Sequence, residues 1–308
     1  MLHDLPNAMQ ESAVAIDPSP RPASESSADP VLSVIVLTHN EEINLPACLD
    51  SLKDLSCKVF VVDSGSTDRT LEIAAARGVA VYQHPFENYA SQRNWAQQNL
   101  PLSGMWVLHL DSDERLTTEL VGEINQVTAQ PPRDIAGFML RKRTIFMGRW
   151  IRHGGHYPSY HLRLFKSSRG RCEDRLYDQH FIVEGRVDRL KHDYLDVVAT
   201  SLSSWTVRHV RWAGLEASEI LAQGQGGRQV VPAAFGNPIQ RRRWWRNAYA
   251  RGPLFFRGFL YWVYRYFFRL GFLDGIPGLI FHFLQGFWFR FLIDATIYER
   301  SLLPPGAE

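Results

Sequence analysis

The sequence predicts an α/β fold with a mainly parallel sheet, an antiparallel extension of that sheet, and an aromatic helical region after it. Two observations predict the sheet. Short apolar runs alternate with amphipathic segments in the first half of the chain, and several of these runs end in polar side chains. Strands that alternate with helices are joined by right-handed crossovers and form a mainly parallel sheet. A third observation, the density of Arg, Trp, Tyr and Phe after residue 240, predicts the helical region.

The parallel part of the sheet is predicted from four apolar runs. Parallel strands are covered on both faces, so they are apolar almost throughout. The runs are Leu32–Thr38, Lys58–Asp63, Val79–Tyr82 and Trp106–Leu110. Apolar spacing and capping residues predict helices at 45–52, 70–77 and 89–96, and another that begins at Thr117.

The alternation of apolar runs with amphipathic segments ends after Asp134. Segments 137–143 and 161–166 have the pattern of strands in an antiparallel extension, and the chain becomes helical beyond about Trp205. The first residues are rich in Ser, Pro, Ala and Asp, with little to bury, which predicts disorder. The expected organisation is a disordered tail, an α/β domain and a helical region, at residues 1–31, 32–205 and 206–308.

Composition narrows the class of protein. The net charge of +2 over 308 residues gives no global reason to expect nucleic-acid binding. Cys48, Cys57 and Cys172 form neither a disulfide framework nor a metal-ligand spacing, which favours a reducing compartment. The N-terminus lacks the charged-then-apolar pattern of a signal peptide. We therefore expect a cytoplasmic location.

Two carboxylates follow the fourth apolar run, at Asp111 and Asp113. Ligands bind beyond the carboxyl ends of parallel strands, and hard divalent cations prefer oxygen ligands while keeping substrate phosphates in their shell. The pair therefore suits a metal that neutralises a diphosphate. The alternative is that Asp113 and Glu114 simply open the helix that follows, because acids favour a first helical turn.

Polar side chains also end the first two runs, on what should be the same edge of the sheet. They are Thr38, Asn40, Glu42 and Asp63. Hydroxyl, amide and carboxylate groups at such an edge can hydrogen-bond a base and a ribose. The strand ends carry neither a G-x-G-x-x-G nor a Walker lysine. This argues against a dinucleotide or ATP enzyme and for phosphate binding through a metal.

Three motifs resemble family 2 glycosyltransferases of the GT-A fold. They are Ser33-Val-Ile-Val-Leu-Thr-His-Asn-Glu-Glu, Val61-Val-Asp-Ser-Gly-Ser-Thr-Asp and Leu110-Asp-Ser-Asp-Glu. The resemblance covers roughly Leu32 to Asp196, and within the family it is greatest to lipopolysaccharide-core β-glucosyltransferase-like enzymes. It implies a nucleotide-sugar donor with UDP as the expected nucleotide, a divalent metal, Mn²⁺ or Mg²⁺, and inversion at the anomeric carbon.

The same resemblance implies roles for single residues. Thr38, Asn40 and Glu42 would line the nucleoside pocket, and Asp63 would contact the base. Asp111 would face the ribose or the sugar, and Asp113 would bind the metal. Arg93 would lie near the donor, and its alternative role is that of a surface arginine on a helix.

An inverting transfer needs a carboxylate that takes the proton of the acceptor hydroxyl. Related enzymes commonly carry a His-Glu pair in this region, whereas this chain has Tyr177-Asp178-Gln179-His180. Asp178 is the candidate base. Glu173 and Asp174 are its rivals, and Asp178 could instead pair with an arginine.

The last third of the chain is aromatic and basic. No Asp or Glu occurs from Ile220 to Leu273. Arg257, Arg265 and Arg269 fall on one face of a helix, which suits a helix in the headgroup region with its arginines extended toward anionic lipid. A second stretch, Ile276–Ile293, is interrupted by polar residues and is expected to be interfacial or shallowly re-entrant. The alternative is a buried helical subdomain that packs on the core or on a second subunit.

Together with the family resemblance, which implies inversion and a nucleotide-sugar donor, these observations predict an inverting, metal-dependent hexosyltransferase on the cytoplasmic side of the inner membrane, peripheral or monotopic. Its partners would be a nucleotide-sugar donor, a lipid-linked or lipopolysaccharide-type glycan acceptor and the membrane surface, and no nucleic acid. Two alternatives stay open. One is a nucleotidyltransferase that uses the same metal–diphosphate geometry, although it would usually carry a Gly-rich basic loop after the first strand. The other is a catalytically silent membrane scaffold.

Overall fold

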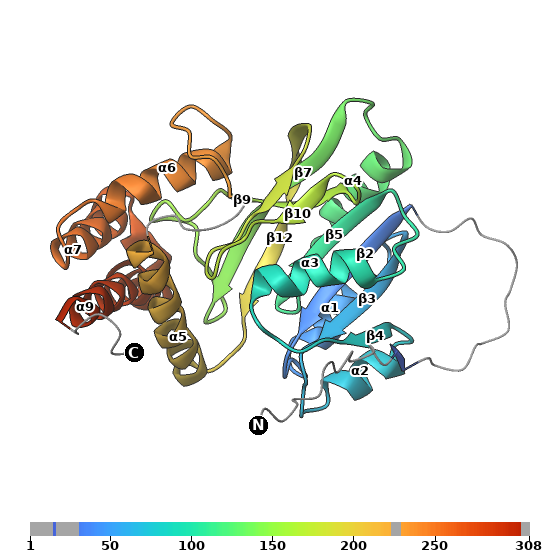
Figure 1. Ribbon diagram of the computed structural model, residues 1–308, viewed down its shortest axis with the longest axis horizontal. Coiled ribbons are helices and arrows are strands. Elements are labelled where there is room, and N and C mark those ends of the chain that lie inside the picture. Colours follow the sequence, from blue (N-terminus) through green and yellow to red (C-terminus); the bar gives the residue numbers. More distant parts are fainter. Residues whose placement is uncertain (1–14, 17–30, 223–228, 303–308) are drawn as a thin grey trace, which may run out of the picture.

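The protein is described by a computed structural model that covers residues 15–16, 31–222 and 229–302. Within these ranges one sheet has the order β1-β4-β3-β2-β5-β9-β7-β12-β6, with β8 beside β7 (Figure 1). Helices cover the first half of the sheet, and α5 to α9 form a separate helical unit beside its other end (Figure 1). This is the α/β fold with a C-terminal helical region that the sequence predicts.

The four predicted parallel strands are present with nearly the predicted bounds. They are β2 (Leu32–Thr38), β3 (Cys57–Asp63), β4 (Ala80–Gln83) and β5 (Trp106–Asp111). The helices around them are α1 (Leu45–Asp50), α2 (Thr70–Ala76), α3 (Tyr89–Asn99) and α4 (Thr118–Ala129). The predicted tail, residues 1–31, lies outside the described residues except for Val31 and a short strand β1 (Ala15–Ile16), which pairs antiparallel with β4.

Strand β2 is buried along its whole length because both faces of the sheet are covered. Successive side chains of a strand point to opposite faces. Val34 and Val36 pack with residues of α1, α2 and α4, whereas Ile35 and Leu37 pack with residues of α3. The apolar run therefore fills two cores at once, which explains why it shows no polar alternation.

The register of the parallel strands brings the polar strand ends together. Thr38 of β2 lies beside Asp63 of β3, and Leu37 lies beside Asp111 of β5. All three strands run in the same direction and end at the same edge. The predicted convergence of polar groups at one edge of the sheet is therefore present.

The antiparallel extension is also present. Strand β9 (Ser159–Lys166) lies antiparallel to both β5 and β7 (Ile135–Phe146), and it contains the predicted segment 161–166. Beyond it lie β12 (Arg186–Val198), parallel to β7, and β6 (Glu114–Leu116), antiparallel to β12. Two short hairpin elements complete the strands, β8 (Arg149–Trp150) on β7, and β10 (Gly170–Cys172) paired with β11 (Phe181–Val183).

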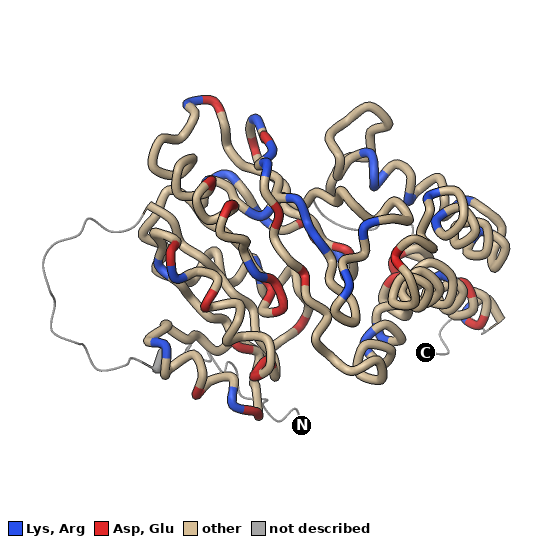
Figure 2. The backbone as a smooth tube through the Cα atoms, turned by 180° about the vertical axis from the view of Figure 1, so that it is seen from behind, with Lys and Arg blue, Asp and Glu red and all other residues tan. Residues whose placement is uncertain are grey.

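Three consecutive basic residues on β7 form a continuous blue run in Figure 2. Each of them pairs with one of two acids on the neighbouring strand β12. Arg141 and Arg143 pair with Asp193, and Lys142 pairs with Asp196 at 2.7 Å. These pairs fix the two long strands against each other, and Lys142 also lines the cavity beyond the strand ends.

The last strand of the sheet ends at Val198, and the helical unit begins with α5. Its elements are α5 (Leu202–Leu221), α6 (Pro238–Ala250), α7 (Phe256–Val263), η1 (Tyr264–Phe268), η2 (Gly271–Asp274), α8 (Gly275–Phe283), η3 (Leu284–Trp288) and α9 (Phe289–Leu302). A segment of the described chain, Gly271–Leu302, is long and apolar enough by length and composition to cross a membrane, and 33% of its most apolar window is buried.

The helical unit buries several charged groups and exposes several large apolar ones. Arg257, Arg265, Asp274 and Asp294 are all less than 7% exposed. Arg257 pairs with Asp294, and Arg265 donates a hydrogen bond to the carbonyl oxygen of Gly154 at 2.7 Å. The expectation that Arg257 and Arg265 extend outward toward lipid is therefore wrong, because each has a buried partner far away in the sequence. Arg269 alone of the three arginines is exposed.

Candidate active site

A cavity of about 890 Å³ lies beyond the carboxyl ends of β2 and β5. Six of the eight predicted site residues line it: Thr38, Asn40, Arg93, Asp111, Asp113 and Asp178. Glu42 and Asp63 do not. The fold therefore brings residues from the first motif, the third motif and the second half of the domain to one place.

Two arginines hold the carboxylate of Asp111. Arg93, on α3, donates to one oxygen at 2.8 Å, and Arg163, on β9, donates to the other at 2.8 Å. Arg163 also pairs with Glu114, which accepts a hydrogen bond from the backbone of Asp111. Burial raises the pKa of Asp111, but the charges of Arg163 and Arg93 outweigh burial and hold it below its usual value. Asp111 is therefore a fixed, ionised acceptor, and Arg93 is a buried ion-pair partner and not a surface arginine.

Asp113 is in the opposite situation. Its carboxylate has no hydrogen-bond or ion-pair partner within the described ranges, while its backbone oxygen accepts from Val197 at 3.0 Å. Burial raises the pKa of Asp113 well above its usual value, and the negative charges of Asp196 and Asp111 raise it further. A carboxylate kept among other acids without a cation fits a divalent metal, whose charge would relieve the repulsion.

Within the part of the chain that the structure describes, no group of three or more His, Cys, Asp or Glu side chains is arranged to hold a metal. A metal at Asp113 would therefore take most of its ligands from phosphate oxygens and water, as Mg²⁺ often does. Asp113 and Glu114 do not open the following helix. That helix, α4, begins at Thr118, and the side chain of Thr117 caps it.

Asp63 is fully buried, and its own turn uses its carboxylate. One oxygen accepts from Thr38 at 2.9 Å, and the other accepts from the backbone of Gly65 and Ser66 at 2.9 and 2.8 Å. Gly65 has a φ of +86°, which favours glycine at this turn. Asp63 thus ties the ends of β2 and β3 together, and direct contact with a base would require one of these bonds to open.

Asn40 and Glu42 make the second link between these strand ends. Asn40 has a φ of +55°, and its side-chain oxygen accepts from the backbone of Thr67 at 2.8 Å. Glu42 is exposed, and it accepts from the backbone of Arg69 at the start of α2. Asn40 therefore lies at the cavity, while Glu42 points to the neighbouring helix. Glu41, between them, lines the cavity instead.

Asp178 lines the cavity with a φ of +53°, and two arginines of α6 bind it. Arg246 lies 2.5 Å away and Arg242 lies 3.4 Å away. Burial raises the pKa of Asp178, but the nearby charges, that of Arg242 foremost, hold it below its usual value. The expected pairing with an arginine is therefore present, and it weakens Asp178 as a base.

The two rivals of Asp178 have other tasks. Glu173 is fully buried and accepts hydrogen bonds from the backbone of His180 and Val230, both at 2.9 Å, and from Arg243. Asp174 is about half exposed and pairs with Arg171. Neither lines the cavity at the strand ends.

Residues 33–184 match the family model described as glycosyl transferase family 2. This segment belongs to that family. The fold above is accordingly the GT-A arrangement that the resemblance implies, and the match favours a glycosyltransferase over a nucleotidyltransferase.

Curated relatives match shorter segments. An uncharacterized glycosyltransferase from Rickettsia typhi is 35% identical over 103 residues, which is 33% of this chain and 35% of the relative. A PGL/p-HBAD biosynthesis glycosyltransferase from Mycobacterium bovis is 50% identical over 50 residues, which is 15% of this chain and 20% of the relative. The chain thus matches about a third, or less, of the length of these relatives.

Two solved structures are similar over most of the chain. The mannosyltransferase PcManGT from Pyrobaculum calidifontis, in complex with GDP-Man and Mn²⁺, is 14% identical, covers 89% of each chain and has a TM-score of 0.47. TarS from S. aureus, residues 1–349 with UDP-GlcNAc, is 14% identical, covers 88% of this chain and 92% of that one, and has a TM-score of 0.41. These values are too low for residue roles to be transferred.

Other residues that line the cavity of the glycosyltransferase domain were not predicted from the sequence. Tyr89 of α3 lines it, as do Arg208, Arg211 and Trp212 of α5. The spacing of the two arginines, three residues apart on a predicted helix, was the only available signal, because such residues share a face. The helical unit therefore contributes to the cavity of the glycosyltransferase domain.

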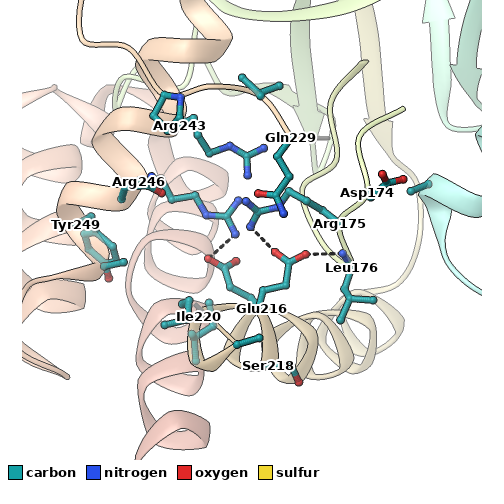
Figure 3. A pocket seen from close by; sticks show the side chains of 18 of the residues that line it. Asp174, Arg175, Leu176, Glu216, Ser218, Ile220, Gln229, Arg243, Arg246 and Tyr249 are labelled. Carbon is teal, nitrogen blue, oxygen red and sulfur yellow. Dashed lines mark hydrogen bonds and ion pairs between the residues drawn. The ribbon is translucent and has the colours of Figure 1, made fainter. Parts of the chain in front are cut away.

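A larger cavity, about 1460 Å³, lies between the glycosyltransferase domain and the helical unit (Figure 3). Guanidinium groups of Arg175, Arg243 and Arg246 point toward its centre above the carboxylate of Glu216 (Figure 3). Arg246 pairs with Glu216 at 2.8 Å, and Arg175 pairs with Glu219. Because these cations are balanced by acids, the cluster joins the two parts of the molecule.

Proposed function

We propose that this chain is an inverting glycosyltransferase that moves a hexose from a nucleotide sugar to a lipid-linked or lipopolysaccharide-type glycan, with UDP as the expected nucleotide. One observation carries the proposal: Thr38, Asp111 and Asp113 meet at one cavity beyond the strand ends of a family 2 domain. The Rickettsia relative is named a glycosyltransferase, which supports the same class.

Asp113 is the proposed ligand for a divalent cation, Mn²⁺ or Mg²⁺. Its unpaired carboxylate among other acids supports this assignment. When bound, such an ion neutralises charge on the diphosphate leaving group. Asp111 has a different proposed role. Because Arg93 and Arg163 fix its carboxylate, it can accept hydrogen bonds from the hydroxyl groups of the ribose or the sugar.

Asp178 is proposed as the base. In the transfer, the acceptor oxygen forms a bond to the anomeric carbon, the bond from that carbon to the diphosphate breaks, and the acceptor proton moves to the carboxylate. Asp178 shares the cavity with Asp113, which supports the assignment. Arg242 and Arg246 lower its basicity, so the proposal requires the acceptor to replace at least one of them.

The helical unit is proposed to attach the enzyme to the cytoplasmic face of the inner membrane as a peripheral or monotopic protein. The segment 267–276, which we call the apolar elbow, exposes six large apolar side chains. They are Phe267, Phe268, Leu270, Phe272, Leu273 and Ile276, each at least 43% exposed. Exposed apolar clusters of this kind mark membrane or protein contacts. Charged groups are buried inside the unit, which supports a unit that enters one leaflet and does not cross the whole membrane.

A position at headgroup depth would bring the cavity to a lipid-linked acceptor. Helix α6 supports this view, because it exposes Trp244 and Trp245 beside Arg241 and Arg242. Tryptophan and arginine side chains are favoured at the membrane–water interface, where the apolar part of the side chain contacts lipid and the polar part contacts water. Arg242 also reaches Asp178, so the same helix touches both the proposed membrane surface and the proposed base.

A screen of nucleotide sugars tests the function. The full chain in mild detergent is titrated with UDP- and GDP-sugars in a calorimeter, with Mn²⁺ and with EDTA, and hydrolysis of the bound sugar is followed. At least one donor should bind and should lose affinity in EDTA. Asp113→Asn should abolish the difference between Mn²⁺ and EDTA, while the exposed control Asp54→Asn should retain it. Binding of no nucleotide sugar would leave the silent scaffold as the better explanation.

A further inference from the structure

Helix α5 places two arginines on the wall of the cavity at the strand ends. Arg208 and Arg211 both line the cavity that contains Asp111 and Asp113. They lie three residues apart in a helix and therefore share a face. The first acid of α5 is Glu216, so the part of the helix that reaches the cavity carries only positive charge.

Neither arginine forms an ion pair with a carboxylate in the described part of the chain, although burial raises the pKa of Glu41 in the same cavity and the charge of Arg208 opposes that rise. Arg208 donates one long hydrogen bond, 3.4 Å, to the hydroxyl of Thr200, and its guanidinium lies 5.8 Å from the ring of Trp212. Arg211 lies 5.9 Å from the ring of Phe86. Two other arginines of the same cavity, Arg93 and Arg163, both pair with Asp111. Arg208 and Arg211 differ from these two arginines because neither forms an ion pair with a described residue, so their guanidinium groups can bind an anion.

The opposite face of α5 is fixed. The rings of His209 and Trp205 stack with their centroids 3.4 Å apart. Ala213 and Ala217 pack with Phe289 of α9 in the core of the helical unit. A helix held in this way presents its other face in a constant position, which reduces the ordering cost of binding. The two arginines are therefore displayed by a rigid element.

We propose that Arg208 and Arg211 bind the diphosphate of the nucleotide donor from the helical side of the cavity. The inference rests on the proposed function, because it assumes a nucleotide donor. A guanidinium offers planar paired donors that match phosphate oxygens, and these charge-assisted hydrogen bonds are the strong ones. The diphosphate would then have two sources of positive charge, a metal at Asp113 and the arginines of α5.

This arrangement predicts a share of diphosphate affinity that does not depend on metal. The test compares binding of UDP and GDP with binding of uridine and guanosine, by calorimetry in EDTA, without acceptor. The double variant Arg208→Gln/Arg211→Gln should lose roughly tenfold or more of its affinity for the diphosphate and keep its affinity for the nucleoside. Arg208→Lys/Arg211→Lys should keep most of the diphosphate preference because the charge remains. The exposed Arg133→Gln is the matched control.

Two results would overturn the inference. Equal losses for diphosphate and nucleoside would show that the arginines only shape the cavity, and an unchanged diphosphate affinity would show that they do not contact phosphate. Because no acceptor is present in the test, any phosphate that the arginines bind must belong to the nucleotide. If the wild-type protein bound neither UDP nor GDP, the proposed function would fail together with the inference. If it bound one of them and the double variant matched it, the inference alone would fail.

Discussion

The guanidinium of Arg93 and the carboxylate of Asp111 lie 2.8 Å apart and join helix α3 to the end of strand β5. The arginine side chain is 9% exposed and the aspartate 31%. An ion pair in this position does more than stabilise the fold. It sets the direction of a carboxylate that lines the cavity, so we expect its loss to change both stability and donor binding.

Arg93→Met should lower the free energy of unfolding by about 2 kcal/mol, because it removes one partner of a largely buried pair while Arg163 remains. The affinity for the donor should fall as well. Urea unfolding and calorimetry measure the two effects. Arg69→Met is the control, since its pair with Glu72 is about 70% exposed and contributes little to stability. Equal effects of the two substitutions would contradict a special role for Arg93.

Asp178→Asn should keep donor affinity and lower turnover by about 10²–10⁴-fold, the usual size of a general-base contribution. Asp174→Asn is the same chemical change four residues earlier, at a half-exposed side chain outside the cavity, and should leave turnover unchanged. Initial rates at saturating donor distinguish the two. Near-normal turnover of Asp178→Asn would show that its two arginine partners keep it structural.

Phe268→Glu and Ile276→Glu should each weaken binding to vesicles that contain anionic lipid by at least about tenfold. Each side chain is 75% exposed in the apolar elbow, and burial of such a group in lipid contributes about 1.5–3 kcal/mol. Vesicle flotation measures the bound fraction. Met105→Glu, at a 53% exposed apolar residue ahead of β5, is the control and should bind like the wild type. Wild-type protein that stays entirely unbound would refute the membrane assignment.

His209 predicts a specific loss of stability in acid. Burial lowers the pKa of His209 to about 4, while its unfolded value is about 6.5. Between these values the unfolded chain binds a proton that the folded chain does not, so stability falls as the pH is lowered. The loss between pH 7 and pH 5 should be about 2 kcal/mol. Unfolding of His209→Gln should lack this component, whereas His192→Gln, at an exposed histidine, should keep it.

Local patterns were enough to predict most of the sheet. The bounds of β2 were predicted to the residue, because burial on both faces leaves a continuous apolar run that stops where the polar edge begins. The meeting of Thr38 and Asp111 followed from the same reasoning, since parallel strands end on one side. These features depend on neighbouring residues alone, so one sequence suffices to see them.

Features that depend on distant partners were not predictable. The contact of Asp63 with the nucleobase stays a prediction, but the bond that its carboxylate accepts from Thr38, on the neighbouring strand, was not predicted. The inward direction of Arg257 depends on Asp294, 37 residues later. Arg208 reaches the cavity because the helical unit packs against the sheet domain. No local sequence pattern predicts that packing.

The exposed apolar side chains of the helical unit have a practical consequence for handling the protein. The interior of this unit is held partly by ion pairs such as Arg257–Asp294, and its outer side leaves aromatic groups in contact with water. Without amphiphiles, copies of the chain should bury these groups against one another, so the apparent mass in solution should depend on the detergent. Assays in plain buffer would then report on aggregates with blocked cavities, and a low specific activity measured there would say little about the chemistry of a single molecule.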